Sequence, residues 1–581
     1  MTVSDATARA LLMRLAQAQR VGRVPSLVAG VVRGGELCWT GARGEATGGP
    51  PPGPDLQYRI GSITKTFTAT AMLQLRDAGV VDLDAPVATV VPAFERLRYP
   101  FAEARAIRFA DLLTHSSGLP RLGRVTYWEP DAPPTAAELR ASLEAIALVR
   151  APGSDYEYSN LGFALLGLAI AELTGVPARE QINRRILTPL GMEATVWDAD
   201  AVPAAHRALA YERGDQREAL PRPLWAMGVN ESAGGLFSSV NDLARYAAWQ
   251  LDAWPPRNDP DDPVLSRASR REAQTIRFAY GGDEFGARGV GWAWHMRTEC
   301  GIGRRVQHGG GTDGFAAELV LLPDHGVAVI VLSNIDDAKP KDYGDGIVTM
   351  LADTGGLSRR SPVPSPEVEA AADRFTALLR TWSSADYEDL LAPVARIDHG
   401  PERAATELDW WRARLGPCER GPLLAATGLA RASYRLRCET AAATLEVNAQ
   451  LGAPTRLFGY RIHSAAVAPD DAVLAAAHGV EALIHDWNDD DFARLFAPHW
   501  SAEGMHEFLA GIGETRGACH VGEVLDVDGP GRGEFELLCD QASMRLRIHL
   551  RPADADAPGT IASLLIRPRQ TKNRCPRDSA P

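Results

Sequence analysis

Apolar residues recur with two different periods along the N-terminal part of the chain. Short apolar runs bounded by turn residues predict strands, and these lie at residues 25–32, 36–40, 315–322 and 327–333. Runs with a helical period predict helices, and these lie at residues 1–20, 69–77 and 160–173. The strands pair as an early and a late hairpin. Helices mixed with hairpins predict an α+β domain rather than a doubly wound sheet.

The pattern changes after a stretch rich in serine and proline, residues 358–366, and from there the chain repeats itself. Residues 375–393 match residues 480–498, with Trp382 over Trp487. Each repeat has two or three helical runs followed by about four strands, which predicts two tandem small α+β modules. Their order of elements resembles cystatin-like modules. The predicted organisation is a first domain, a linker, two modules and a tail, at residues 1–357, 358–370, 371–468, 469–568 and 569–581.

Length and charge narrow the class of partner. At 581 residues, several domains are expected. The net charge of −13 disfavours nucleic acid and anionic membranes, which need a positive face. No run of apolar residues reaches membrane-spanning length, and residues 1–20 lack the apolar core of a secretory signal. We therefore expect a cytoplasmic protein with a small-molecule substrate, with export by another route left open.

Cysteines leave one question open. Cys418 and Cys438 lie 20 residues apart, as do Cys519 and Cys539 in the second repeat. Each pair is either a disulfide or a matched pair of core positions, and the lack of a secretory signal favours reduced thiols. Cysteine spacing elsewhere does not suggest zinc, so we expect no metal and no cofactor.

Ser62 and Lys65 are the first candidates for chemistry. The chain has only four lysines, Lys65, Lys339, Lys341 and Lys572. Arginine cannot lose its proton in a protein, whereas a desolvated lysine can act as a base. At the start of a helix, residues i and i+3 share a face, so the Lys65 amine can reach the Ser62 hydroxyl. Taken alone, the pair fits a helix cap and a surface lysine equally well.

Two further polar segments fit the same chemistry. Tyr158 and Asn160 project to one side if the backbone is extended, where a phenol can relay protons and an amide can position a substrate; Asn160 could equally be a helix N-cap. The segment His308-Gly309-Gly310-Gly311 precedes the late hairpin, where a backbone N–H could complete an oxyanion hole with that of Ser62.

Together these motifs resemble the penicillin-recognising serine hydrolases, in the branch of class C β-lactamases, D-aminopeptidases and carboxylesterases. The resemblance extends over residues 8–355 and includes residues 112–119 and 232–239. It implies an antiparallel sheet flanked by helices, with a helical lobe and the active site between them. It also implies that Ser62 is the nucleophile, that Lys65 and Tyr158 share proton transfer, that Asn160 positions the substrate, and that His308, Gly310 and Gly311 form the third element.

One departure from that family bears on the substrate. Its β-lactamases and carboxypeptidases usually carry Lys-Thr-Gly where this chain has His308-Gly309-Gly310, so recognition of a substrate carboxylate is in doubt. The sequence therefore predicts a serine hydrolase acting through a Ser62 acyl-enzyme, an esterase or D-amino-acid peptidase. A β-lactamase or D-Ala-D-Ala carboxypeptidase is the alternative.

The sequence also allows a non-enzyme and a different hydrolase fold. A binding or assembly protein with a slow or inert hydrolase domain is the non-enzyme alternative, and the repeats could then carry partner contacts or a homo-oligomer interface. A lipase-like α/β-hydrolase is disfavoured, because Asn230 stands where the nucleophile motif around Ser232 needs glycine.

Overall fold

The computed structural model describes residues 3–44, 52–123, 133–283, 286–360, 363–452, 454–551 and 559–568. The chain divides into two compact units, Met1–Arg360 and Ser361–Pro581.

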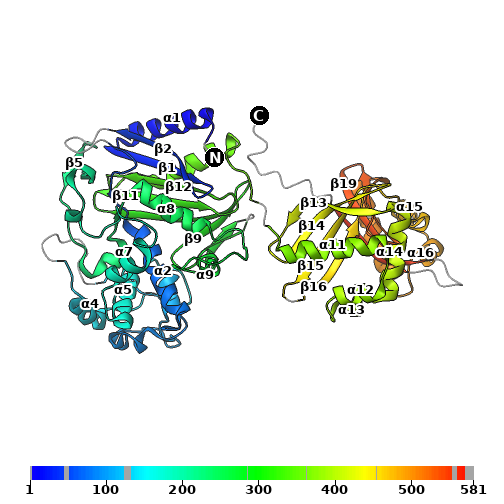
Figure 1. The fold of residues 1–581 in the computed structure, drawn as a ribbon, viewed down its shortest axis with the longest axis horizontal. Helices are drawn as coiled ribbons and strands as arrows, with labels where there is room; N and C mark the ends of the chain where they lie inside the picture. Colours follow the sequence, from blue (N-terminus) through cyan, green and yellow to red (C-terminus); the bar gives the residue numbers. More distant parts are fainter. Residues whose placement is uncertain are drawn as a thin grey trace. The chain divides into compact units, whose positions relative to one another are not determined.

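An eight-stranded antiparallel sheet forms the centre of the first unit (Figure 1). Its strands, in spatial order, are β2 (Glu36–Gly44), β1 (Ser26–Arg33), β12 (Val327–Ser333), β11 (Phe315–Leu322), β10 (Gly303–Thr312), β9 (His295–Glu299), β8 (Gly286–Val290) and β7 (Phe278–Asp283). Both hairpins expected from the apolar runs are present, and β1 joins them by pairing with β12.

Helices cover both faces of this sheet. Helices α1 (Asp5–Gly22) and α10 (Pro340–Asp353) pack on one face, where alternate residues such as Ala29 and Val329 form a core. Helices α2 (Thr64–Asp77) and α8 (Val240–Leu251) belong to the opposite core, which contains the intervening residues such as Val28 and Ala328. Both faces of the central strands are therefore buried, which explains why their sequences are continuously apolar rather than alternating.

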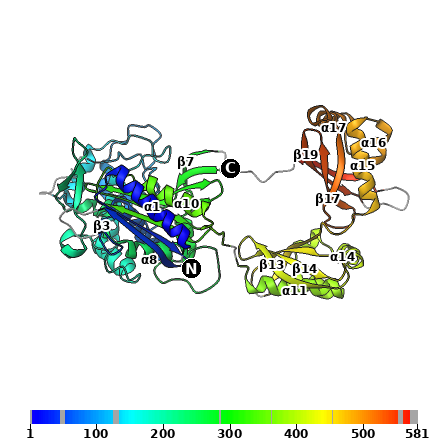
Figure 2. The ribbon, with the colours of Figure 1, turned by 90° about the horizontal axis from the view of Figure 1, so that it is seen from above.

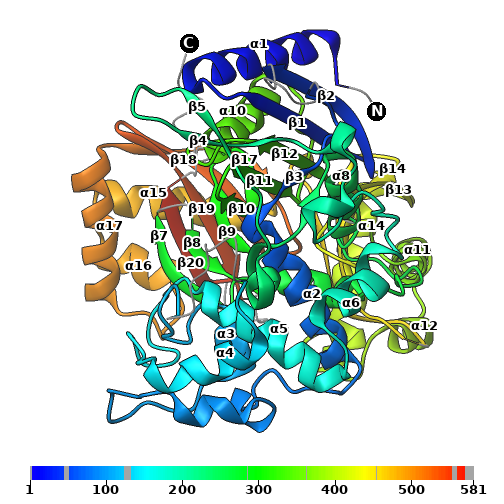
Figure 3. The ribbon, with the colours of Figure 1, turned by 90° about the vertical axis from the view of Figure 1, so that its left-hand side faces the viewer.

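A helical lobe lies beside the sheet (Figure 3). The remaining α-helices of the first unit are α3 (Phe109–Leu113), α4 (Ala136–Ser142), α5 (Asn160–Thr174), α6 (Ala178–Ile182), α7 (Glu231–Gly234) and α9 (Arg267–Ala273). Two small antiparallel pairs complete the unit, β3 (Tyr58–Arg59) with β6 (Phe237–Ser238) and β4 (Ala210–Arg213) with β5 (Ala219–Arg222). Helix α5 ends before Gly175, which adopts φ 74°, the left-handed conformation that glycine commonly supplies after a helix.

Among the described residues no single helix is long and apolar enough to cross a membrane. Residues 160–174 and 178–187 are long and apolar enough only when taken together, and the two segments are bent by 78° relative to each other. Helix α5 is buried in the core of the lobe, which accounts for its apolar sequence.

The second unit consists of two modules of the same architecture, each with its own apolar core (Figure 2). The first contains α11 (Pro366–Arg380), α12 (Ser384–Leu390), α13 (Ala395–Asp398) and α14 (Pro401–Leu415), then β13 (Cys418–Ala426), β14 (Arg431–Cys438), β15 (Ala443–Gln450) and β16 (Arg456–His463). The second contains α15 (Asp471–His485), α16 (Asp489–Leu495) and α17 (Ala502–Arg516), then β17 (Cys519–Asp526), β18 (Arg532–Cys539), β19 (Ala542–Leu550) and β20 (Ile561–Pro568). Each set of strands forms a four-stranded antiparallel meander.

Two expectations about the second unit need correction. Helix α11 begins at Pro366, inside the stretch expected to be linker, because proline is favoured at the first helical position and Ser365 precedes it. The cysteines were expected to be reduced, but Cys418–Cys438 and Cys519–Cys539 are disulfides. In each module the two cysteines face each other across the first pair of antiparallel strands, which brings their Cα atoms to 4.1 and 3.9 Å.

Candidate active site

Ser62 lies in a single turn, Gly61–Ile63, that leads directly into α2. Gly61 adopts φ 52°, and a Cβ atom there would lie 2.7 Å from the backbone nitrogen of Gly311. Glycine is therefore required on both grounds, left-handed backbone and lack of space. This close approach places the serine against strand β10.

Lys65 contacts Ser62 as predicted from the spacing. Its Nζ donates to Ser62 Oγ at 2.9 Å and to the carbonyl of Ala233 at 2.7 Å. The side chain is fully buried. Burial, and to a smaller extent the charge of Arg121, lower the pKa of Lys65 well below its ordinary value. The amine is thus suited to accept the proton of the serine hydroxyl.

Tyr158 completes a three-residue contact around the nucleophile. Its side chain hydrogen-bonds with that of Ser62, and burial raises the pKa of its phenol to about 12. The Nζ atom of Lys65 lies 5.1 Å from the centre of the Tyr158 ring. The phenol therefore keeps its proton at neutral pH and can donate it to a leaving group.

The backbone after Tyr158 is extended, as expected. Ser159 has φ −125° and ψ 113°, and its Oγ accepts from the N–H of Gly162 at 3.0 Å. Ser159 is therefore the N-cap of α5, and the alternative that assigned this cap to Asn160 is wrong. Asn160 is the first residue of the helix, two positions from Tyr158, and its side chain is half-buried.

The glycine-rich end of β10 forms the third side of the site. Strand β9 pairs with β10 only as far as Gln307, so residues 308–312 present an edge that β9 does not cover. A side chain on Gly310 would collide with the carbonyl of Ile60, whereas a Cβ on Gly311 would meet open space. The Gly311 backbone is thus accessible beside Ser62, where an N–H could face a substrate oxygen.

His308 is buried beside these glycines. Its Nδ1 lies 2.6 Å from the carbonyl of Gly309, and its Nε2 has no partner among the described protein atoms. Burial, followed by the neighbouring His295 and Lys65, lowers its pKa well below the ordinary value. His308 is therefore neutral and supplies no fixed positive charge.

Two histidines that the sequence did not single out also belong to the site. His115 stacks on Tyr158 with ring centres 4.2 Å apart, and its Nδ1 accepts from the N–H of Ser159 at 3.1 Å. His295 lies 5.3 Å from His308 between ring centres, and burial lowers its pKa to about 4. The sequence does carry a signal for His115, because it lies in the segment 112–119 that is part of the family resemblance. His295 lies on a short strand that no motif marked.

The segment that imitates a lipase nucleophile motif has another task. Ala233 accepts the hydrogen bond from Lys65, and the carbonyl of Ser232 accepts from Thr68 Oγ1 at 2.7 Å. Both residues lie in helix α7. Residues 231–234 therefore position Lys65 and helix α2, and Ser232 is not the nucleophile.

Among the described residues, one set of His and carboxylate side chains is close enough to share a metal ion. It consists of Glu481, His485 and His520, all in the second module.

Comparisons with known proteins identify the family. Residues 13–353 match the family model described as Beta-lactamase. The D-alanyl-D-alanine-carboxypeptidase/endopeptidase AmpH of Escherichia coli (strain K12) is 29% identical over 312 residues, which are 52% of this chain and 78% of that protein. The human beta-lactamase-like 1 protein is 28% identical over 402 residues, 66% of this chain and 76% of that protein.

A solved structure shows the same fold. The octameric penicillin-binding protein homologue from Pyrococcus abyssi has a TM-score of 0.52 at 22% identity, covering 79% of this chain and 96% of that chain. At this identity the likeness concerns the fold alone.

Proposed function

Because the chain belongs to the beta-lactamase family of serine hydrolases, we propose that it cleaves an ester or a D-amino-acid amide through an acyl-enzyme on Ser62. The observation that carries the proposal is the contact of a fully buried lysine amine with the serine hydroxyl, 2.9 Å from Nζ to Oγ. A surface lysine would be charged and solvated, and could not serve as a base near neutral pH.

The first half-reaction follows from these contacts. Neutral Lys65 takes the proton of Ser62 as Oγ attacks the substrate carbonyl. The backbone N–H groups of Ser62 and Gly311 stabilise the oxyanion. The Tyr158 phenol gives a proton to the departing alcohol or amine and recovers one from Lys65. Water then attacks the ester on Ser62 by the reverse route and releases the acyl group.

The neutral state of His308 favours esters and uncharged amides over β-lactams. A substrate carboxylate needs a fixed positive charge, and the pKa of His308 lies too low to provide one. Gly309 also supplies no hydroxyl at the position where the related enzymes carry the threonine of Lys-Thr-Gly.

A second candidate function is D-Ala-D-Ala carboxypeptidase. Arg121 is exposed, and its guanidinium carbon lies 5.2 Å from the centre of the Tyr158 ring. It could bind a terminal carboxylate in place of the missing lysine, and the similarity to AmpH supports this alternative.

A substrate panel on the purified chain tests both candidates. We expect turnover of p-nitrophenyl acyl esters and of D-amino-acid p-nitroanilides, with nitrocefin and D-Ala-D-Ala peptides far slower. Arg121→Ala should leave ester turnover near normal. If D-Ala-D-Ala peptides are the best substrates and Arg121→Ala raises their KM at least about tenfold, the carboxypeptidase is right.

A fluorophosphonate probe separates an enzyme from a binding protein. The probe should label the chain at Ser62 and fail to label Ser62→Ala. Absence of labelling together with absence of turnover over the whole panel would instead support the inert, partner-binding alternative.

A further inference from the structure

We propose that the second module binds a divalent transition-metal ion of the Zn²⁺ type through Glu481, His485 and His520. The proposal is independent of the hydrolase reaction, since all three residues lie in the second module, outside the unit that contains Ser62.

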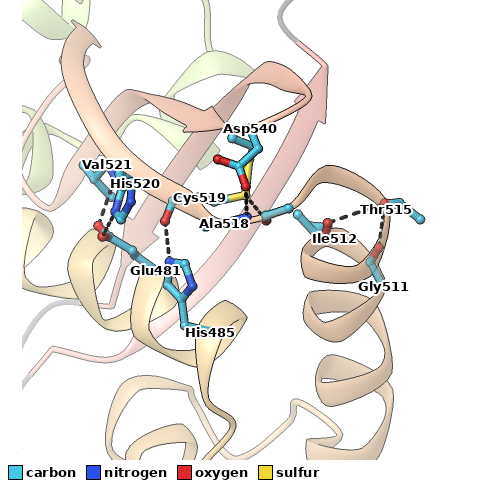
Figure 4. The surroundings of a disulfide bond; sticks show 12 residues. Glu481, His485, Gly511, Ile512, Thr515, Ala518, Cys519, His520, Val521 and Asp540 are labelled. Atoms are coloured by element: carbon cyan, nitrogen blue, oxygen red, sulfur yellow. Dashed lines mark hydrogen bonds and ion pairs between the residues drawn. A yellow bond between two sulfur atoms is a disulfide. The ribbon is translucent and has the colours of Figure 1, made fainter.

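The fold brings the three side chains together from two elements (Figure 4). Glu481 and His485 are one turn apart on α15 and therefore share a face of that helix. His520 follows Cys519 at the start of β17. One ligand atom from each residue lies within 4.8 Å of the others. Two histidines and one carboxylate are a known ligand set for zinc, with a fourth position left for water or another ligand.

The spacing needs only a small adjustment for an ion to enter. Ligands at tetrahedral zinc lie about 3.4 Å from one another, given bonds of about 2.1 Å. His520 Nδ1 and Glu481 Oε1 are already 3.0 Å apart. His485 and His520 are exposed, so their rings can turn without disturbing the core. An ion would replace the proton now shared by His520 and Glu481, and that proton would move to Nε2 of the same imidazole.

The surrounding contacts orient the carboxylate. The N–H of Val521 donates to Glu481 Oε2 at 2.9 Å. His478 lies one turn earlier on α15, with Nδ1 3.2 Å from Glu481 Oε2. His485 is oriented by the carbonyl of Cys519, 2.6 Å from its Nε2.

The first module shows that the architecture does not require these residues. Its helix α11 and strand β13 correspond to α15 and β17, with equal helix length and with Cys418 matching Cys519. At the positions of His478, Glu481, His485 and His520 it carries Asp373, Thr376, Arg380 and Glu419. Asp373 there forms an ion pair with Arg420. The imidazoles are therefore a specific property of the second module, which makes a ligand-binding role a better explanation than a structural one.

Zinc titration of the full-length chain, freed of metal by a chelator, tests the proposal. Equilibrium dialysis should find one bound Zn²⁺ that is lost when His485→Arg and His520→Glu install the residues of the first module. Affinity should fall at least about tenfold in His520→Gln alone. His506→Ala, which removes another exposed histidine of the same module, is the matched control and should change nothing.

Two further measurements use the same samples. Zn²⁺ should raise the unfolding temperature of the native chain but not of the His485→Arg/His520→Glu chain, because binding stabilises only the folded site. Ca²⁺ and Mg²⁺, which prefer oxygen ligands, should not compete with Zn²⁺. Circular dichroism and cooperative unfolding of both chains without metal report that the variant is folded. Zinc binding that is equally tight in the double variant, or that needs millimolar Zn²⁺ in the native chain, would overturn the proposal.

Discussion

The two units use glutamate and histidine in opposite environments. In the first, Glu318 and His308 are buried, burial raises the pKa of Glu318 to about 7, and it lowers that of His308. In the second, Glu481 keeps a lowered pKa beside exposed His520. The first arrangement holds a neutral imidazole, that of His308, beside the nucleophile. The second keeps a charged carboxylate and rotatable imidazoles available to a ligand. Burial, rather than residue type, decides which chemistry is possible.

Lys65→Arg is the strongest test of that difference. Arginine stays charged and cannot act as a base, so kcat/KM for the best ester should fall at least about 10³-fold. Stopped-assay turnover with purified protein measures it. Lys341→Arg is the matched control, because that lysine is exposed and forms a surface ion pair with Asp345.

The pH profile of the native chain gives the same test without a mutation. Because the pKa of Lys65 is lowered well below 10.5, the amine is neutral over a wide range and kcat/KM should be flat above the lowered value. The rate should fall only as the pH drops through it. A rate that keeps climbing to pH 10 would mean that the lysine is charged at neutral pH and is not the base.

Tyr158→Phe should have the next largest effect. It removes the proton donor but keeps the ring that stacks on His115, so kcat should fall about 10²-fold with little change in stability. Leaving groups that need no protonation, such as p-nitrophenolate, should be affected less than amines. Tyr156→Phe, at a neighbouring aromatic residue, should leave both substrates near normal.

Much of the first unit could be predicted because its signals are local. The apolar runs predicted both hairpins and α5 correctly. Ser62 and Lys65 contact each other because Lys65 lies three positions after Ser62, about one helical turn further along the chain. Tyr158 and the glycines of β10 came from motif resemblance, and their contact with the serine depends on tertiary packing that no local pattern contains. The same holds for His295, which only the pairing of β9 with β10 brings near His308.

The second unit shows where local reasoning failed. Reduced cysteines were expected because no secretory signal is recognisable in residues 1–20. The strand register nevertheless places the two cysteines of each pair opposite one another, and they form disulfides. The cytoplasmic location expected from the same reasoning stays a prediction. Glu481 and His485 have the spacing of helix-borne metal ligands, but the third residue, His520, lies on a strand far along the chain.

Glu318→Gln should change the pH dependence of stability in the first unit. Glu318 lies on β11 opposite Gly309, near Arg305, Asp345, Lys341 and Arg297. Its pKa of about 7 exceeds the ordinary 4.5, so its contribution to stability is full below pH 4.5 and is lost as the pH rises through 7. The loss amounts to about 3 kcal/mol. The free energy of unfolding of Glu318→Gln, relative to the native chain, should therefore improve by about that amount between pH 4.5 and 8.5. Glu36→Gln, at an exposed position, should show no such change.

His520→Ala in the metal-free chain should have the smallest effect of all. His520 is 70% exposed in its side chain, and its only described polar contact is the one with Glu481. Exposed ion pairs and hydrogen bonds contribute well under about 1 kcal/mol, so the unfolding free energy of the second unit should hardly move. With Zn²⁺ present the same substitution should cost the whole metal-dependent increase in unfolding temperature. Calorimetry without Zn²⁺ measures the change in unfolding free energy, and calorimetry with Zn²⁺ measures the loss of the metal-dependent increase in unfolding temperature. A large cost without metal would mean that His520 holds the module together, as the buried residues of the first unit do, and the contrast between the two units would be lost.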